Sequence, residues 1–351
     1  MAGKIQPVSF PLPDEPVFDE IIDVRAPIEF AEDHIAGAVN LPVLFDDQRE
    51  RIGTQYKQES SFEAQKAGAA LVSENIAGHL REHFQSKPKE YRPLIYCFRG
   101  GQRSRSLASV LSEIGWSAGI VVGGYKTYRS HVLTMIEKRS QALNFHVING
   151  LTGSGKTVFL WALNSMGAQV LDLEGLANHK GSVFGQDREN PQPSQKRFDS
   201  LVFDQLQGFS ESRPIFVEAE SAKIGRLNLS LPLRARLRES PVSELVSPTS
   251  SRVDFLYRDY SSWLTDPQRV METIDRLQPF HSGETIARWK TWCEEGKWRD
   301  LIGELLENHY DERYGCDKEK NYRRPDRQIH LSDQTDAVIQ KSAAEFLKGV
   351  E

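Results

Sequence analysis

The chain has 351 residues, of which 39% are hydrophobic and 26% are charged, with a formal net charge of −5. This balance is typical of a globular protein with buried cores, and it excludes an overall basic surface for nucleic acid while allowing local basic patches. The three cysteines, Cys97, Cys293 and Cys316, form no Cys-x-x-Cys pair, which argues against a zinc ribbon or a disulfide scaffold. The first ten residues lack a signal-peptide pattern, and no apolar run approaches the roughly 20 residues that span a bilayer, so we expect a cytoplasmic protein without membrane contact.

Strand and helix patterns alternate along the first part of the chain. In chain order they predict a strand at 20–24, a helix at 27–32, a helix at 60–84, a strand at 93–96, a helix at about 103–114, a strand at 119–122 and a helix at 125–142. Ser60 and Glu63 have capping-box spacing at the start of the long helix, and Gly115 is suited to end the helix at about 103–114. Such alternation predicts an α/β domain with a parallel sheet, which we place at 10–138.

A second unit, placed at 139–351, begins with another strand. The patterns predict strands at 145–148, 169–172 and 214–218, mostly helix from about residue 266, and amphipathic helices at 285–295, 297–308 and 333–347. The stretch 181–195 is polar and contains several Gly and Pro residues, which predicts a mobile loop beside the site of this unit. We therefore expect a second α/β domain with a helical C-terminal part.

The first candidate site is the turn between the strand at 93–96 and the next helix. It reads Cys97-Phe98-Arg99-Gly100-Gly101-Gln102-Arg103-Ser104. A helix N-terminus and two arginines favour a thiolate, and the two glycines allow a tight turn, so we expect a reactive, reachable sulfur with a lowered pKa in a cradle for an oxyanion. A buried structural cysteine is the alternative.

The second candidate site is a phosphate loop between a strand and a helix. Its sequence fits G-x-x-x-x-G-K-[ST], with Gly150, Gly153, Ser154, Gly155, Lys156 and Thr157 as its phosphate-binding residues. Backbone N–H groups and Lys156 would bind phosphate, and Thr157 would ligate Mg²⁺. Asp172 and Glu218 follow or end apolar strands and are candidates to orient metal or water, or simply to cap helices. The loop fits ATP, GTP or a prenyl diphosphate equally well.

Basic residues interleaved with aromatic ones form a third feature. The candidate RNA contacts are Arg226, Lys290, Lys297, Arg299, Arg323 and Arg324. Such groups bind phosphates and stack on unpaired bases, but they are equally typical of solvated helix faces whose tryptophans pack inward. We predict no resident metal centre, and a lone His309 is more often structural than a ligand.

The first domain resembles the rhodanese family of sulfurtransferases. The resemblance rests on Ile22 to Arg25 with Glu29, on Asp33 to Pro42, and on Tyr96 to Ser104. Five residues separate Cys97 from Arg103 where typical rhodaneses have four, which implies a wider cradle. This Cys-x5-Arg spacing also resembles dual-specificity phosphatases of the same fold, although Tyr96 replaces their histidine.

The whole chain resembles the tRNA 2-selenouridine synthases. The second half carries the resemblance at 149–157, 171–182, 216–221, 223–227 and 309–311. It implies a rhodanese-like domain followed by a P-loop domain, and replacement of sulfur by selenium in wobble 2-thiouridine, with selenophosphate as donor. It further implies an S-geranyl intermediate made from geranyl diphosphate, Cys97 as selenium carrier, and Arg99, Arg103 and the loop amides as anion binders. The implied partners are the tRNA anticodon loop and the enzyme that makes selenophosphate, and Mg²⁺ would accompany the diphosphate.

Three alternatives stay open. One is a rhodanese sulfurtransferase or a Cys-x5-Arg phosphatase with a regulatory nucleotide-binding domain. Another is a small-molecule kinase that carries an inert rhodanese module. The third is a non-catalytic RNA-binding adaptor, which has no need of a thiol flanked by arginines.

Overall fold

The computed structural model describes residues 3–12, 17–186, 190–312 and 322–350. The chain divides into two compact units. Unit 1 comprises Met1–Met135 and Pro193–Asp204, and unit 2 comprises Ile136–Gln192 and Gln205–Glu351. A short stretch of the second half of the sequence, 193–204, therefore folds with the first unit.

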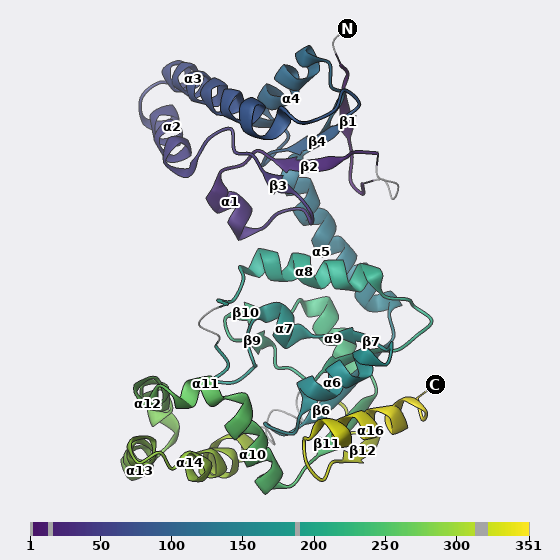
Figure 1. Cartoon of the computed structure of the whole chain (residues 1–351), viewed down its shortest axis with the longest axis vertical. Helices are drawn as coiled ribbons and strands as arrows, with labels where there is room; N and C mark the ends of the chain where they lie inside the picture. The colour runs from purple at the N-terminus through teal and green to yellow at the C-terminus, as the bar shows by residue number, and fades with distance from the viewer. Residues whose placement is uncertain (1–2, 13–16, 187–189, 313–321, 351) are drawn as a thin grey trace. The chain divides into compact units, whose positions relative to one another are not determined.

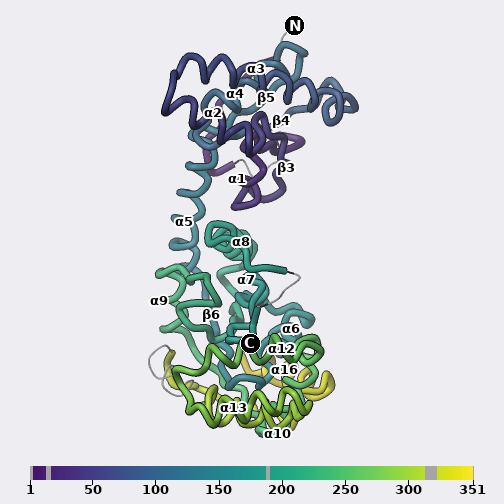
Figure 2. Tube along the Cα trace, turned by 90° about the vertical axis from the view of Figure 1, so that its left-hand side faces the viewer, coloured from purple at the N-terminus to yellow at the C-terminus, as the bar shows by residue number. Residues whose placement is uncertain are grey.

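Unit 1 is built on a five-stranded sheet that is parallel throughout. The strand order is β1-β5-β4-β2-β3, with β1 Ile5–Val8, β2 Glu20–Asp23, β3 Val39–Asn40, β4 Pro93–Tyr96 and β5 Ala118–Val121. The helices are α1 Pro27–Glu32, α2 Asp46–Gln58, α3 Ser61–His79, α4 Gln102–Ile114 and the start of α5 Gly124–Ala142, with a π-helical turn at Leu80–Phe84. Figure 2 shows α2, α3 and α4 gathered at one end of this unit.

The core of unit 1 lies between the sheet and α3–α4. Ile22, Ile95, Leu107 and Leu111 are fully buried there, and Cys97 belongs to the same cluster. The fully buried β4, Pro-Leu-Ile-Tyr, has the continuous apolar character expected of a central parallel strand.

Unit 2 has a second five-stranded parallel sheet, ordered β12-β11-β6-β8-β7. Its strands are β6 Phe145–Gly150, β7 Gln169–Leu171, β8 Ile215–Glu218, β11 Val242–Val246 and β12 Arg327–His330. Helix α6 (Lys156–Ser165) packs against α16 (Asp336–Leu347), and both contribute to the core beside β6. Unit 2 also contains α7 Leu173–Ala177, α9 Leu231–Glu239 and the short ribbon β9 Lys223–Ile224 with β10 Leu227–Asn228. Helix α8 Gln195–Gly208 begins in unit 1, to which its residues 195–204 belong, and ends in unit 2.

A cluster of helices with its own core completes unit 2 (Figure 1). It contains α10 Thr249–Asp259, α11 Ser261–Leu264, α12 Pro267–Asp275, α13 Gly283–Glu294, α14 Trp298–Leu305 and a π-helical turn at Leu306–Asp311. Trp289 and Cys293 are buried in this core. Among the described residues, no helix is long and apolar enough to cross a bilayer.

The predicted α/β fold class is confirmed, as are the strands that deliver both candidate loops. Several elements are missing from the prediction, among them β1, β3, α2, α8, α9, α10, β11 and β12. The expectation of mostly helix after residue 266 is wrong at β12, which pairs with β11 at the sheet edge. Because β12 has only one buried residue, Ile329, its sequence shows little apolar signal.

Candidate functional site

The thiol of Cys97 lies at the point where β4 turns into α4. Gly101 is the N-cap of α4, and its backbone N–H donates to the Cys97 Sγ at 3.3 Å; the Ser104 hydroxyl lies at the same distance from it. Burial opposes ionisation of this thiol, but the hydrogen bonds from Ser104 and from the backbone N–H groups of Arg99, Ser104 and Gly101 outweigh it. The pKa of Cys97 therefore lies below its ordinary value, as the sequence predicts.

The expectation of an openly reachable sulfur is wrong for this conformation. Cys97 is only 3% exposed and belongs to the core cluster of unit 1. The reason is geometric, since the side chain points back under its own loop toward Ser104 rather than outward. The exposed residues of the turn are Phe98, Arg99 and Gln102.

The two arginines, which the sequence predicts to favour the thiolate, contact other groups of unit 1. Arg103 donates to both oxygens of Glu29, at 2.7 and 3.5 Å, and Glu29 also pairs with Arg49. The Arg99 guanidinium lies over the Phe98 ring, 5.6 Å from its centre. The lowered pKa of Cys97 thus comes chiefly from the helix N-terminus and Ser104, with Arg99 as the exposed cation of the loop.

The two glycines of the turn have different roles. Gly100 has φ +66°, and a Cβ there would lie 2.8 Å from the Val121 carbonyl oxygen. Gly101 has a negative φ, and a Cβ there would meet nothing within 4 Å. The prediction that glycine avoids a Cβ clash is therefore confirmed for Gly100 and wrong for Gly101.

Several residues that carry the rhodanese resemblance of unit 1 form a buried polar network next to this loop. Arg25 pairs with Asp23 at 2.6 Å and donates to the Asp33 carbonyl oxygen. The Asp33 carboxylate accepts from Tyr125, at 2.8 Å, and from Ser200, at 2.9 Å. Ser200 belongs to the segment 193–204, so this segment completes the first unit's own network.

The phosphate loop follows β6, and α6 begins at Lys156. Gly150, Gly153 and Gly155 have φ of +156°, +77° and +89°, and a Cβ on any of them would lie 3.0 Å or less from another atom. Lys156 donates from Nζ to the Gly150 carbonyl oxygen at 3.0 Å, curling over the loop. The buried Ser154 hydroxyl has no hydrogen-bond partner among the described residues, as expected of a group that awaits a ligand oxygen.

The two predicted carboxylates have different positions. Asp172 caps α7 by accepting from the Gly175 N–H at 2.7 Å, and it accepts from the Trp161 indole at 3.0 Å, so the capping alternative holds for it. Glu218 is buried at the end of β8 and accepts from the Glu174 N–H at 2.7 Å. Burial, then the neighbouring carboxylates of Asp172 and Glu174, raise the pKa of Glu218 well above its ordinary range.

Two further acidic residues, which the sequence analysis does not single out, line the same cavity as the loop. Thr157 donates from Oγ1 to Glu174 at 3.2 Å. Glu220 lines the same cavity, and loss of solvation followed by the Glu174 charge raises the pKa of Glu220 well above its ordinary range, while Lys156 acts in the opposite direction. Both sit in stretches that carry the family resemblance, 171–182 and 216–221, which is the signal that could have found them.

Arg252 supports the phosphate loop from α10. Its buried guanidinium donates to the Thr152 carbonyl oxygen at 2.8 Å and to both Asp311 oxygens at 2.7 and 2.9 Å. In the stretch 309–311, Asp311 thus holds the guanidinium of Arg252. His309, in the same stretch, has its imidazole Nδ1 2.9 Å from Nε2 of His281.

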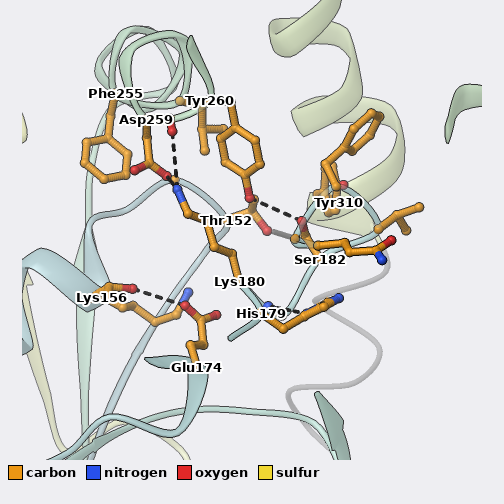
Figure 3. Close-up of a pocket in the computed structure, with 18 of the residues that line it drawn as sticks. Thr152, Lys156, Glu174, His179, Lys180, Ser182, Phe255, Asp259, Tyr260 and Tyr310 are labelled. Atoms are coloured by element: carbon orange, nitrogen blue, oxygen red, sulfur yellow. Dashed lines mark hydrogen bonds and ion pairs between the residues drawn. The ribbon is translucent and has the colours of Figure 1, made fainter. Parts of the chain in front are cut away.

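The loop opens into a cavity of about 1020 Å³. Figure 3 shows Lys156 and Glu174 on one side, with Ser182, Tyr260 and Tyr310 across from them. Residues Gly181–Gln186 line this cavity, so the predicted loop does lie beside the site; residues 187–189 are outside the described part of the chain.

The candidate RNA contacts lie on several elements of unit 2, and three of the six pair with carboxylates. Lys290 pairs with Asp275, Lys297 with Glu295 and Arg299 with Asp254, at 2.6, 2.7 and 3.0 Å. Arg226 donates to Gln192, Arg323 donates to the Glu239 carbonyl oxygen, and Arg324 is exposed. Trp289 packs inward, as the solvated-face alternative expects. Cys316 lies outside the described residues.

The two units and their loops define a protein that joins a rhodanese-like domain to a P-loop domain. A family model for the rhodanese-like domain matches residues 12–131, and one for the tRNA 2-selenouridine synthase AAA domain matches residues 143–282. Curated proteins named tRNA 2-selenouridine synthase are 41% identical in Bdellovibrio bacteriovorus, 37% in Nitrosomonas europaea and 33% in Sulfurovum sp..

These matches cover 68%, 73% and 86% of this chain, in the same order. They cover 64% of the Bdellovibrio protein, 68% of the Nitrosomonas protein and 89% of the Sulfurovum protein. The chain belongs to the tRNA 2-selenouridine synthase family.

Proposed function

We propose that this protein is a tRNA 2-selenouridine synthase, which replaces the sulfur of wobble 2-thiouridine by selenium from selenophosphate through an S-geranyl intermediate. The observation that carries the proposal is the presence, in one chain of this family, of a thiol cradle with a lowered cysteine pKa and a phosphate loop with a large cavity. A thiol suits selenium transfer, and the cavity suits a diphosphate with an organic tail.

The first step is geranyl transfer at the phosphate loop. The sulfur of 2-thiouridine attacks the first carbon of geranyl diphosphate, so that a C–S bond forms, the C–O bond breaks, and the diphosphate leaves with the electron pair. The base loses its N3 proton. This alkylation turns the sulfur into a better leaving group. Lys156 and the loop N–H groups would hold the diphosphate as its charge grows.

Mg²⁺ fits this loop as a companion of the diphosphate. The Thr157 hydroxyl and the Glu174 carboxylate are adjacent oxygen donors, and Mg²⁺ is usually held by one or two carboxylates together with phosphate oxygens. When bound, the ion would neutralise charge on the leaving diphosphate.

The second step loads selenium onto Cys97. The thiolate attacks the selenium of selenophosphate; an S–Se bond forms, the P–Se bond breaks, and phosphorus keeps the electron pair and leaves as phosphite after taking up a proton. The Gly101 N–H and Arg99 would steady the anionic donor. Because Cys97 is nearly sealed, a small anion suits the cradle better than a bulky donor.

The third step places selenium on the base. The terminal selenium of Cys97 attacks C2 of the geranylated base, and the geranyl thiolate leaves. A small thiol then attacks the Cys97 sulfur, which releases 2-selenouridine and leaves a mixed disulfide that a second thiol reduces. The anticodon loop would present its base unstacked, with the basic residues of unit 2, such as Arg226 and Arg324, as candidates to hold its phosphates. The enzyme that makes selenophosphate is a further expected partner.

The test uses the purified full chain with an anticodon stem-loop RNA containing 2-thiouridine, geranyl diphosphate, selenophosphate and a thiol. We expect nucleoside mass spectrometry to detect S-geranyl-2-thiouridine and then 2-selenouridine, and phosphorus NMR to detect phosphite. Cys97→Ser should stop at the geranylated base, whereas Cys293→Ser should not. Selenation by Cys97→Ser with release of phosphate would overturn the carrier role and favour direct attack by selenophosphate.

A further inference from the structure

The phosphate-loop cavity continues into a second, smaller pocket in the helical cluster of unit 2. Thr152, Leu256, Tyr260, Trp263 and Tyr310 are among the residues that line both spaces. The smaller pocket has a volume of about 70 Å³. We call it the apolar slot.

The slot starts at the phosphate loop itself. Thr152, a residue of that loop, lines it, and Leu256 of α10 lies against the next residue, since a Cβ on Gly153 would be 2.9 Å from the Leu256 side chain. A ligand whose phosphates occupy the loop therefore has its next atoms at the mouth of the slot.

The deep end of the slot is hydrocarbon. The residues that line it but not the larger cavity include Leu264, Val270, Leu301, Ile302 and Leu305, from α11, α12 and α14. The hydroxyl-bearing residues that line the slot, Thr152, Ser182, Tyr260 and Tyr310, also line the larger cavity, and the Tyr260 and Ser182 hydroxyls lie 3.3 Å apart. Burial raises the pKa of Tyr260 and of Tyr310, so both hydroxyls are neutral and add no charge to the passage.

This lining separates the candidate ligands of the phosphate loop. A nucleobase carries several donors and acceptors, and burying them among leucine and isoleucine side chains without partners is costly. A branched hydrocarbon chain has no such groups and gains free energy from every carbon that leaves water. The slot is also too small for a base with its sugar and fits the distal part of a short chain.

We propose that the apolar slot binds the isoprenoid tail of the diphosphate held by the phosphate loop, and that it sets the length of chain that the protein accepts. This inference rests on the proposed function, which names geranyl diphosphate as the substrate. The P-loop of this chain therefore serves a prenyl diphosphate in place of a nucleotide.

The test measures binding of four ligands to the full chain by calorimetry: inorganic diphosphate, and the dimethylallyl, geranyl and farnesyl diphosphates. Three variants are compared with the unchanged protein. Leu264→Trp fills the slot from a half-buried position, and Leu264→Ala enlarges it. Leu231→Trp makes the same size change at a residue of α9 that is 76% exposed.

We expect the unchanged protein to bind geranyl diphosphate at least about tenfold more tightly than inorganic diphosphate, since each buried CH₂ contributes roughly 0.8 kcal/mol. Leu264→Trp should lose that advantage and keep its affinity for inorganic diphosphate. Leu264→Ala should bind farnesyl diphosphate more tightly than the unchanged protein does, and Leu231→Trp should match the unchanged protein.

The outcomes separate the two proposals. If the unchanged protein bound neither geranyl diphosphate nor inorganic diphosphate, the proposed function would be overturned. Tight geranyl diphosphate binding that is equal in the unchanged protein and in Leu264→Trp would overturn the slot alone. If Leu264→Trp also lost inorganic diphosphate, Leu264→Ala decides, because an unaltered chain-length preference in that variant contradicts the slot.

Discussion

The two loops share one backbone design and differ in what surrounds them. Each follows a central strand of a parallel sheet, turns on at least one glycine of positive φ, and leads into a helix N-terminus. In the first loop the reactive atom lies under the turn, and Cys97 is 3% exposed. In the second, Lys156 and Glu174 face a cavity of about 1020 Å³.

In both loops the helix N-terminus favours an anion, and the residues around the loop determine which anion is held. In the thiol loop the anion that the backbone N–H groups stabilise is the cysteine's own thiolate. In the phosphate loop the N–H groups border a large cavity, and the anion that we propose for it is a diphosphate with an organic tail.

The largest effect is expected from replacing Lys156, the cation of the phosphate loop. Lys156→Ala should slow geranylation about a hundredfold or more, because charge on the leaving diphosphate loses its main fixed counter-charge. Alkylation of Cys97 should be unchanged. The measurement is S-geranyl product by mass spectrometry, with Lys341→Ala, an exposed lysine on α16, as the control. An undiminished rate would mean that the P-loop is not the diphosphate site.

The two glycines of the thiol loop give a matched pair for stability. Gly100→Ala should destabilise unit 1 by about 1–3 kcal/mol, because its φ is +66° and its Cβ would press on the Val121 carbonyl. Gly101→Ala should cost much less, since its Cβ has open space. Denaturant unfolding of the two variants measures the difference, and equal losses would contradict the geometry of the turn.

Glu220 should make diphosphate binding depend on pH. The pKa of this carboxyl is raised, so it is neutral below that pKa and becomes charged as the pH rises through it. The added negative charge near Lys156 should weaken diphosphate binding several-fold on the alkaline side. Glu220→Gln should remove this part of the pH dependence, as calorimetry at a series of pH values would show; an identical profile in both proteins would rule it out.

A smaller effect is expected at Ser104. Its hydroxyl stabilises the Cys97 thiolate, so Ser104→Ala should raise the pH midpoint of Cys97 alkylation by about one unit or less. Cys293 offers an internal control, since burial and Glu294 raise the pKa of this thiol to about 11. Mass spectrometry after iodoacetamide treatment should find Cys97 modified before Cys293 at neutral pH. The reverse order would contradict a poised thiolate.

Local patterns were sufficient to predict both loops, because strand, glycines and helix are contiguous there. The strands β11 and β12 are not predicted, since the place of β11 depends on pairing with β6, far away in the sequence, and the place of β12 depends on pairing with β11. The same limit applies to the sites. No local sequence pattern indicates that Glu29 pairs with Arg103. The same holds for Arg252, which pairs with Asp311 and donates to the Thr152 carbonyl oxygen. The apolar slot joins α10, α11, α12 and α14, whose leucines resemble any core positions.

The central claim is that the phosphate loop serves geranylation and the thiol loop serves selenium transfer. Its most direct test is nucleoside mass spectrometry of tRNA from cells that carry Lys156→Ala or Cys97→Ala. The account predicts that Lys156→Ala leaves 2-thiouridine unmodified and that Cys97→Ala accumulates S-geranyl-2-thiouridine, with 2-selenouridine missing from both. Ordinary amounts of 2-selenouridine in the Cys97→Ala cells would contradict it.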